Sequence, residues 1–272
     1  MPYAHVVTGK VDIDKIETRQ DGGLESEAGK LKVAELGKEL TELQELLYAA
    51  GTHSLLIVLQ GRDTAGKDGA IRKLSQHVNV QGVKVTGFKI PTAEELAHDF
   101  LWRIHQHAPA KGQVAIFNRS HYEDVLVVKV HGFAPEHVLE KRYGQIDEFE
   151  QLLTQNNTIV VKFCLHISKE EQEERLLARE QEVAKSWKLS PGDWKEREYW
   201  DVYTKAYNEA LARCSHKHAL WHVVPADRKW FRDLCIVETL VDTLKPYKKE
   251  WLKRLTEMGE KAKAELEEYR RS

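Results

Sequence analysis

The chain has 272 residues, of which 42% are hydrophobic and 31% charged, as is typical of a soluble globular protein with a substantial core. A net charge of −2 argues against a dedicated nucleic-acid-binding protein. The sequence has no run of about 18 apolar residues, which a membrane-spanning helix would need. The cysteines Cys164, Cys214 and Cys235 lack metal-ligand spacing, so we expect reduced thiols in a cytoplasmic protein.

Residues 1–23 are polar, have no apolar segment of a secretion signal and end in Asp-Gly-Gly, so we expect a loosely structured arm. Helical periodicity begins at Leu24, with leucines spaced four, three and four residues apart, and Gly51 is a typical helix end. His53–Leu59 is a short, nearly continuous apolar run, which predicts a strand buried on both faces of a parallel sheet.

Further apolar runs of the same kind follow, separated by helical stretches. We predict strands at Val83–Phe88, Val114–Phe117, Ile159–Ile167 and Trp221–Val224. Capping boxes at Thr92 and Ser168, and a proline after Ser190, mark helix starts. Strands that alternate with helices predict an α/β doubly wound domain, in which ligands bind at the carboxyl ends of the strands.

The last segment, residues 246–272, continues an apolar spacing that begins at Leu240. The spacing is close to an 11-residue repeat, which predicts a long amphipathic helix. This helix must cover either the parent domain or another subunit.

The segment GRDTAGKDG, residues 61–69, contains most of a phosphate-binding loop. It follows a buried strand and opens a helix, so its backbone N–H groups would cradle phosphate oxygens, with Lys67 as a point charge on them. The hydroxyl residue that normally follows the lysine and holds Mg²⁺ is replaced by Asp68. Asp63 could hold a metal or orient an attacking phosphate oxygen. The alternative for the segment as a whole is a glycine-rich turn with a surface lysine, and the alternative for Asp63 is an aspartate that caps the loop.

The third strand ends in FNRSHYED, with Asn118 where phosphate-loop enzymes usually have an aspartate that tunes the Mg²⁺ shell. Arg119, at the carboxyl end of this strand, would contact a transferring phosphate, or form a salt bridge with a nearby carboxylate. Asn118, Glu123 and Asp124 together keep the capacity to hold a metal or to orient an acceptor. Residues 60–120 hold nine Lys or Arg against five Asp or Glu, so the loop lies in a basic region.

Five segments together resemble polyphosphate kinase family 2: GRDTAGKDG, FKIPTAEELAHDFLWRIHQHAPAKG, FNRSHYEDVLV, FCLHISKEEQEERLLARE and VVPADRKWFRDL. These enzymes move phosphate between inorganic polyphosphate and nucleotides, and the resemblance runs from about Lys32 to about Leu244. The family's loop has the form G-x-D-x-x-G-K-x-G, so Asp63 belongs to the pattern. Asn118 departs from the F-D-R-S form of many members and resembles class III, which handles nucleoside mono- and diphosphates.

The resemblance implies a thymidylate-kinase-like fold, with a kinase domain over residues 24–245, a helical lid at about residues 168–200, and Mg²⁺ or Mn²⁺ held by Asp63. By analogy, the catalytic residues are Asp63, Lys67, Arg119 and Glu123. The implied phosphate-binding residues are Gly61, Arg62, Ala65, Gly66, Lys67, Asp68, Gly69, Lys89, Arg175 and Arg179. Of the last two, we expect one to close on phosphate. The implied nucleotide-binding residues are Asn118, Arg119, Glu123 and Asp124.

Weaker candidates accompany these residues. They are His98, Arg103 and His105 beside Lys89, Asp227, Arg228 and Lys229 after the last strand, and Lys185 and Lys188 in the lid.

The predicted reaction is the reversible transfer of a phosphoryl group from polyphosphate to AMP, ADP or both, by in-line displacement in a cytoplasmic homo-oligomer, a dimer or tetramer. One alternative is an ATP-dependent nucleoside monophosphate kinase on the same fold, which would be expected to carry Ser or Thr after Lys67 and an acid at position 118. The other is a phosphate-loop sensor without turnover. Nucleic-acid binding is disfavoured because the basic region lacks interleaved aromatic residues.

Overall fold

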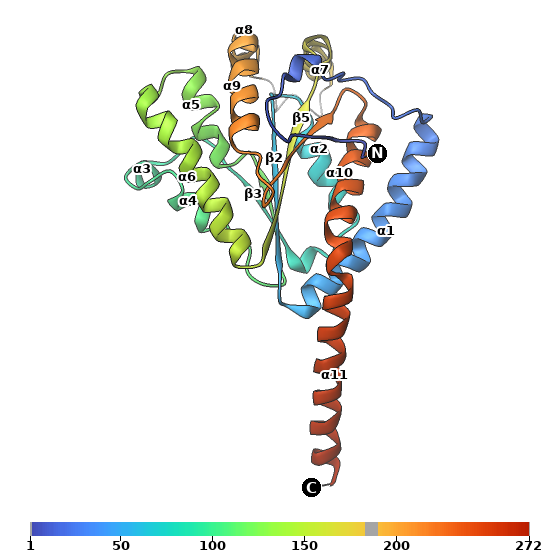
Figure 1. The fold of residues 1–272 in the computed structure, drawn as a ribbon. Coiled ribbons are helices and arrows are strands. Elements are labelled where there is room, and N and C mark those ends of the chain that lie inside the picture. The colour runs from blue at the N-terminus through green and yellow to red at the C-terminus, as the bar shows by residue number, and fades with distance from the viewer. Residues whose placement is uncertain (1, 183–189, 272) are drawn as a thin grey trace.

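The computed structural model describes residues 2–182 and 190–271, which form a six-stranded sheet between two layers of helices (Figure 1). The strands are β1 (His5–Val6), β2 (Ser54–Gly61), β3 (Val83–Gly87), β4 (Val114–Asn118), β5 (Thr158–His166) and β6 (Trp221–Pro225). Their order across the sheet is β3-β4-β2-β5-β6-β1, and β2 to β6 are parallel while β1 is antiparallel to β6. The predicted α/β architecture is therefore confirmed.

The strand order indicates where on the sheet a ligand would bind. The chain builds β3 and β4 on one side of β2 and then crosses to build β5 and β6 on the other. In a doubly wound sheet, this reversal makes the carboxyl end of the first strand the point where ligands bind. That point is Gly61, where the phosphate loop begins.

Helices cover both faces of the sheet. One face carries α1 (Ser26–Ala50), α2 (Lys67–Leu74) and α10 (Lys229–Leu244), and the other carries α6 (Glu136–Gln155) and α9 (Trp200–Arg213). The shorter elements are η1 (Ile13–Lys15), η2 (Val80–Gly82), α3 (Ala93–Leu96), α4 (Trp102–His105), η3 (His121–Asp124) and α5 (Val127–Val130). The remaining ones are α7 (Lys169–Gln181), α8 (Pro191–Glu198), η5 (Lys245–Tyr247) and α11 (Lys248–Arg271).

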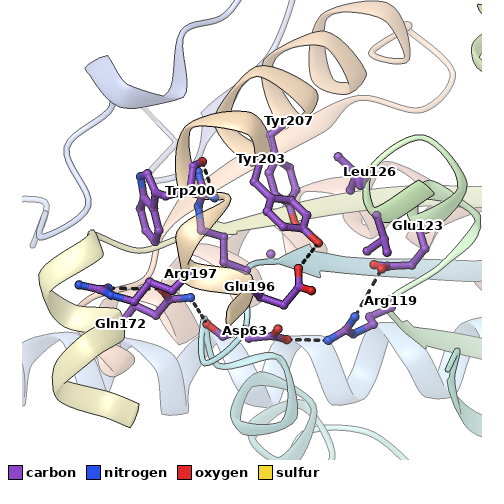
Figure 2. Close-up of a pocket in the computed structure, with 13 residues that line it drawn as sticks. Asp63, Arg119, Glu123, Leu126, Gln172, Glu196, Arg197, Trp200, Tyr203 and Tyr207 are labelled. Carbon is purple, nitrogen blue, oxygen red and sulfur yellow. Dashed lines mark hydrogen bonds and ion pairs between the residues drawn. The ribbon is translucent and has the colours of Figure 1, made fainter. Parts of the chain in front are cut away.

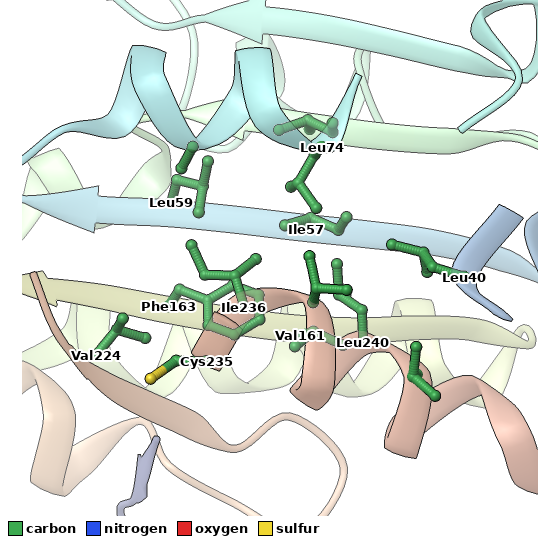
Figure 3. Packing of buried hydrophobic residues seen from close by; sticks show 14 of the residues in the cluster. Leu40, Ile57, Leu59, Leu74, Val161, Phe163, Val224, Cys235, Ile236 and Leu240 are labelled. Carbon is green, nitrogen blue, oxygen red and sulfur yellow. The ribbon is translucent and has the colours of Figure 1, made fainter. Parts of the chain in front are cut away.

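The core divides along the sheet because successive side chains of a strand point to opposite faces. On β2, Ile57 and Leu59 pack on the face that holds α2 and α10, whereas Leu56 and Val58 pack on the face that holds α6 and α9. Figure 3 shows the first of these layers, with side chains from β2 and β5 meeting those of α10. All eight residues of β2 are buried, as its continuous apolar run predicts.

The strand at β3 differs from the prediction. We expected a run buried on both faces, but β3 lies at the edge of the sheet and Val85 is 47% exposed. Its polar residues Lys84 and Thr86 alternate with valines, and the exposed Lys84 suits an edge strand, because a charged side chain there discourages pairing with another chain.

The N-terminal arm also differs, because the expected loose structure is wrong for much of it. Val7 and Ile13 are each 1% exposed and join the core on the α9 face, and β1 pairs with β6. Further along the arm, the Thr18 hydroxyl donates to Asp227 at 2.8 Å. The apolar residues of the arm are scattered among polar ones and show no periodicity, yet several of them pack into the two core layers of the domain.

The C-terminal helix α11 follows α10 through η5 and extends away from the body of the protein (Figure 1). Its first turns lie against α1, where Trp251 is fully buried and donates to His53 at 3.2 Å. The predicted apolar stripe thus covers the parent domain only at its start. In the part of the chain that the structure describes, none of the helices combines the length and apolar character needed to cross a membrane.

Candidate active site

The phosphate loop connects β2 to α2 and takes a conformation that requires glycine at both ends. Gly61 has φ 152°, and a Cβ atom there would lie 2.6 Å from the carbonyl oxygen of Leu165 on β5. Gly66 has φ 102°, and a Cβ there would lie 2.3 Å from the guanidinium group of Arg232. The two glycines allow the loop to turn tightly against its neighbours and to present the N-terminus of α2.

Lys67 begins α2 and is folded back over the loop. Its ammonium group donates to the carbonyl oxygens of Gly61, at 2.7 Å, and Arg62, at 3.1 Å. Burial lowers its pKa, and the nearby positive charge of Arg119 lowers it further. The ammonium group therefore lies at the loop that would hold a phosphate, and an anion bound there would favour the charged form of the lysine.

Arg119 links the loop to the strand beside it. Its Nη2 atom lies 2.6 Å from Oδ1 of Asp63, and its Nη1 atom lies 3.4 Å from Oε2 of Glu123 (Figure 2). Burial lowers the pKa of Arg119, but Glu123 and Asp63 raise it more, so the side chain stays charged. Three of the four predicted catalytic residues, Asp63, Arg119 and Glu123, thus form one connected group. The charges of all three also influence the pKa of the fourth, Lys67.

The structure also places the residues around this group. The side-chain amide of Asn118 donates to Oδ1 of Asp68 at 2.9 Å, so the end of β4 is joined to the first turn of α2. Asp124 points elsewhere, because its carboxylate pairs with Arg142 of α6 at 3.2 Å and is 12% exposed. Asp124 was predicted to bind nucleotide together with Arg119, but its carboxylate is directed toward α6 instead.

The two predicted lid arginines hold different contacts. Arg175 on α7 donates to the carbonyl oxygen of Thr64 at 2.9 Å and to those of Ala226 and Asp227 at 2.7 and 3.0 Å. It therefore ties α7 to both the phosphate loop and the segment after β6. Arg179 instead pairs with Asp193 of α8 at 2.6 Å. The candidates Lys185 and Lys188 lie outside the described residues.

A pocket opens between the loop, the turn after β4 and the helices α8 and α9. Thirteen residues line it: Gly61, Arg62, Asp63, Arg119, Glu123, Leu126, Val127, Gln172, Glu196, Arg197, Trp200, Tyr203 and Tyr207. Five of them are residues that the sequence singled out for phosphate, metal or nucleotide. The pocket lies at the carboxyl ends of β2 and β4, where the sheet topology places a ligand.

The side chain of Arg62 turns toward α9. Its guanidinium group stacks on the ring of Trp200, 3.8 Å from the ring centroid, and donates to the Thr204 hydroxyl at 2.6 Å. A phosphate in the loop would therefore meet residue 62 through its backbone, while its side chain fixes the distance between loop and α9.

Several lining residues were missed by the sequence analysis. Gln172 of α7 donates to the backbone carbonyl of Asp63 at 3.0 Å, and the Tyr203 hydroxyl donates to Glu196 at 2.8 Å (Figure 2). The signal available was the spacing of Trp200, Tyr203 and Tyr207 on one helical face. That spacing alone does not distinguish a pocket wall from a core-facing helix.

Lys89 and the weaker candidates within the described residues are not among the residues that line the pocket. Lys89 is exposed beyond β3, and its carbonyl oxygen accepts a hydrogen bond from Arg103 at 2.9 Å. His98 stacks on Trp102. Asp227 accepts from the backbone of Ser168 at 2.9 Å and therefore supports the start of α7. Arg228 pairs with Asp21 of the N-terminal arm. Lys229 is the first residue of α10, and His105 is the last residue of α4.

The chemistry of the donors fits a hard divalent cation. Within the described ranges, no group of three His, Cys, Asp or Glu side chains is arranged to hold a metal ion by itself. Mg²⁺ in phosphoryl-transfer sites is usually held by one or two carboxylates together with substrate phosphates. Asp63 and Glu123 supply carboxylate oxygens to the same pocket as the phosphate loop.

A glycine-rich loop at the switch point of a parallel sheet, with its lysine and a facing arginine, defines a phosphate-loop kinase fold and site. The chain belongs to the polyphosphate kinase 2 family, whose family model matches residues 23–251. The resemblance seen in the sequence is thereby confirmed.

Two curated relatives and one solved structure illustrate this membership. The chain is 49% identical to an AMP/ADP-polyphosphate phosphotransferase of Meiothermus ruber over 212 residues, which cover 78% of this chain and 79% of the relative. It is 42% identical to an ADP-polyphosphate phosphotransferase of Rhodopseudomonas palustris, over 88% and 87% of the two chains. The crystal structure of polyphosphate kinase 2 from Arthrobacter aurescens TC1 is 41% identical, has a TM-score of 0.85, and is matched over 91% of its length by 89% of this chain.

Proposed function

We propose that this protein reversibly transfers a phosphoryl group from inorganic polyphosphate to AMP and ADP. The observation that carries the proposal is the connected group of Asp63, Arg119 and Glu123, which lines one pocket with Gly61 and Arg62 of the phosphate loop. The similarity to an AMP/ADP-polyphosphate phosphotransferase over most of both chains supports the choice of donor and acceptors.

Phosphoryl transfer requires alignment and neutralisation of charge more than covalent chemistry from the protein. The loop N–H groups and Lys67 would hold the phosphate that the N-terminus of α2 faces. Arg119 would stabilise negative charge on the transferring group, since it keeps its own charge and lies within reach of the loop. The attacking oxygen of a nucleotide phosphate is already anionic near neutral pH, so no strong general base is needed.

Asp63 would hold Mg²⁺ or Mn²⁺ together with substrate phosphates, with Asn118 or Glu123 assisting. When bound, such an ion neutralises charge on the two phosphate groups that exchange the phosphoryl unit. The ion pair between Asp63 and Arg119 keeps the carboxylate directed into the pocket.

Asn118 and Glu123 are proposed to place the acceptor nucleotide, and we infer that the segment from about residue 168 to 200 acts as a lid. The contacts of Arg175 with the loop and of Arg62 with Trp200 support this, because they connect both sides of the lid to the phosphate site. Since one phosphoanhydride replaces another, the reaction should be nearly balanced in both directions.

The test uses purified protein, Mg²⁺ and polyphosphate without ATP, with AMP in one reaction and ADP in another. Ion-exchange chromatography follows the nucleotides over time. Conversion of AMP to ADP and onward to ATP supports the proposal. Reaction with one acceptor alone would remove the dual specificity. Activity only when ATP is the donor would instead support the nucleoside monophosphate kinase that shares this fold.

A further inference from the structure

A group of polar side chains is buried beneath the turn that follows β4. Lys162 of β5 donates to the Tyr122 hydroxyl at 2.8 Å and to the carbonyl oxygen of Cys214 at 2.6 Å, and it forms an ion pair with Glu150 of α6. The Tyr122 hydroxyl in turn donates to Oε1 of Glu150 at 2.9 Å, and Nε2 of His121 lies 3.2 Å from the same oxygen. We call His121, Tyr122, Glu150 and Lys162 the buried network.

The charges of this network are matched although each of its side chains is 0% exposed. Lys162 has an acceptor for each of its three N–H donors. Burial lowers the pKa of His121, so the neutral ring donates to the ionised Glu150. Burial also raises the pKa of Glu150, but Lys162 and His121 lower it more. Since apolar residues often serve as well as a buried ion pair for stability, stability alone does not account for this arrangement.

The network lies directly beneath the active-site turn. Ser120, His121 and Tyr122 lie between Arg119 and Glu123 in the chain, so the backbone that carries both active-site groups also carries two side chains of the network. Arg119 has φ 64°, a left-handed conformation that costs energy in a residue other than glycine and persists only when its surroundings hold it. The Ser120 hydroxyl next to it accepts from Gln60, the residue before the phosphate loop, at 3.2 Å.

We propose that Tyr122, Glu150 and Lys162 are positioning residues, which hold the strained turn so that Arg119 and Glu123 face the phosphate loop. The inference rests on the proposed phosphoryl transfer at that loop. It assigns a role in turnover to three buried side chains that are not among the residues lining the pocket, and that act through the backbone of residues 119–123.

The test is the variant Tyr122→Phe, which removes the hydroxyl that accepts from Lys162 and donates to Glu150 while keeping the ring. We expect kcat to fall about ten- to a hundredfold, as for a small misplacement of an aligned group, while the KM for polyphosphate changes by less than about twofold. Tyr143→Phe is the matched control. Tyr143 is 2% exposed in the same core layer, and its hydroxyl has no hydrogen-bond partner among the described residues.

A double-mutant cycle with Arg119→Lys separates positioning from a general loss of stability. If Tyr122 acts through Arg119, adding Tyr122→Phe to the Arg119→Lys protein lowers kcat by less than about threefold. Equal losses in both backgrounds, or unchanged kcat in Tyr122→Phe, would overturn the inference. A parental protein that uses only ATP as donor would overturn the proposed function instead, and the same cycle run with ATP would still decide about the network.

Discussion

At the scale of single residues, Lys67 and Asp63 make the main side-chain contacts of the phosphate loop: Lys67 with the carbonyl oxygen of Gly61, and Asp63 with Arg119. Lys67→Ala removes a buried cation from the loop carbonyls, and Asp63→Ala releases Arg119 and removes the carboxylate offered to a metal. We expect each change to lower kcat by about a hundredfold or more, because charge aimed at the transferring group is lost. Steady-state rates at saturating Mg²⁺ measure this, with circular dichroism to verify the fold. Near-parental turnover in either variant would show that the loop is assigned wrongly.

Asp124 is a buried carboxylate whose ionisation opposes folding. Burial raises its pKa to about 6, although Arg142 beside it acts in the opposite direction. An unfolded chain loses this proton near pH 4, so between about pH 4 and 6 the native state binds a proton that the unfolded chain has released. The resulting stabilisation is present below about pH 4 and is lost as the pH rises to about 6.

The variant Asp124→Asn carries a neutral amide and should lose this pH dependence. Relative to the parent, its free energy of unfolding should improve by on the order of 2 kcal/mol between about pH 4.5 and 7.5. Urea unfolding of both proteins across this range gives the difference. A difference that is constant with pH would mean that Asp124 is already ionised in the native state at pH 4.5.

At the scale of secondary-structure elements, α7 is attached to the phosphate site by one arginine and to α8 by another. Arg175→Ala leaves the carbonyl oxygens of Thr64, Ala226 and Asp227 without their donor. We expect the free energy of unfolding to fall by about 1–3 kcal/mol, the usual effect of unsatisfied buried groups. Denaturant unfolding measures this loss, and an unchanged unfolding midpoint would contradict the role assigned to these bonds.

Arg179→Ala should behave differently, because Arg179 pairs among the described residues with Asp193, and both side chains are partly exposed to solvent. Ion pairs in contact with solvent contribute about 0–1 kcal/mol, so stability should hardly change. If Arg179 is the lid arginine that closes on phosphate, its removal raises the KM for polyphosphate. Initial rates over a range of polyphosphate concentrations test this, and an unchanged KM would leave that role to another residue.

The elements themselves were largely predictable from local patterns. Apolar runs marked β2 and β5, and the box at Thr92 forms the two reciprocal hydrogen bonds that it predicts. The edge position of β3 was not predictable, because β3 and the core strands all lie in short runs rich in apolar residues, and only the neighbouring strands in the sheet decide exposure. The arm was missed for the same reason: Ile13 is buried by α9, which lies far away in sequence.

At the scale of the whole molecule, the active site combines segments that no short motif contains. The loop and the turn with Arg119 were predictable because each follows a strand, and the carboxyl ends of parallel strands meet. The wall formed by Trp200 and Tyr203 was not, since its distance from the loop depends on how α8 and α9 fold back over the sheet. The opposed directions of Glu123 and Asp124 depend likewise on the turn conformation of η3.

The outer part of α11 presents an apolar stripe to solvent, in which Leu252, Met258, Leu266 and Tyr269 are 43–79% exposed. Charge is distributed unevenly along the helix. Residues 248–256 hold four basic side chains and one acidic one, whereas residues 257–271 hold five acidic and four basic ones. Two copies packed antiparallel would place the basic first part of each helix beside the glutamates of the other and cover both apolar stripes.

We therefore predict that a second copy of the chain pairs with α11, which makes the expected homo-oligomer. Light scattering during gel filtration should give at least a dimer for the parent, and association should weaken at high salt, because the facing charges are screened. The double variant Met258→Glu and Leu266→Glu should be monomeric, since charges would interrupt the stripe. Ala264→Glu, which adds a charge on the opposite face of the same helix, should assemble like the parent. A monomeric parent, or equal assembly of all three proteins, would exclude α11 as the interface.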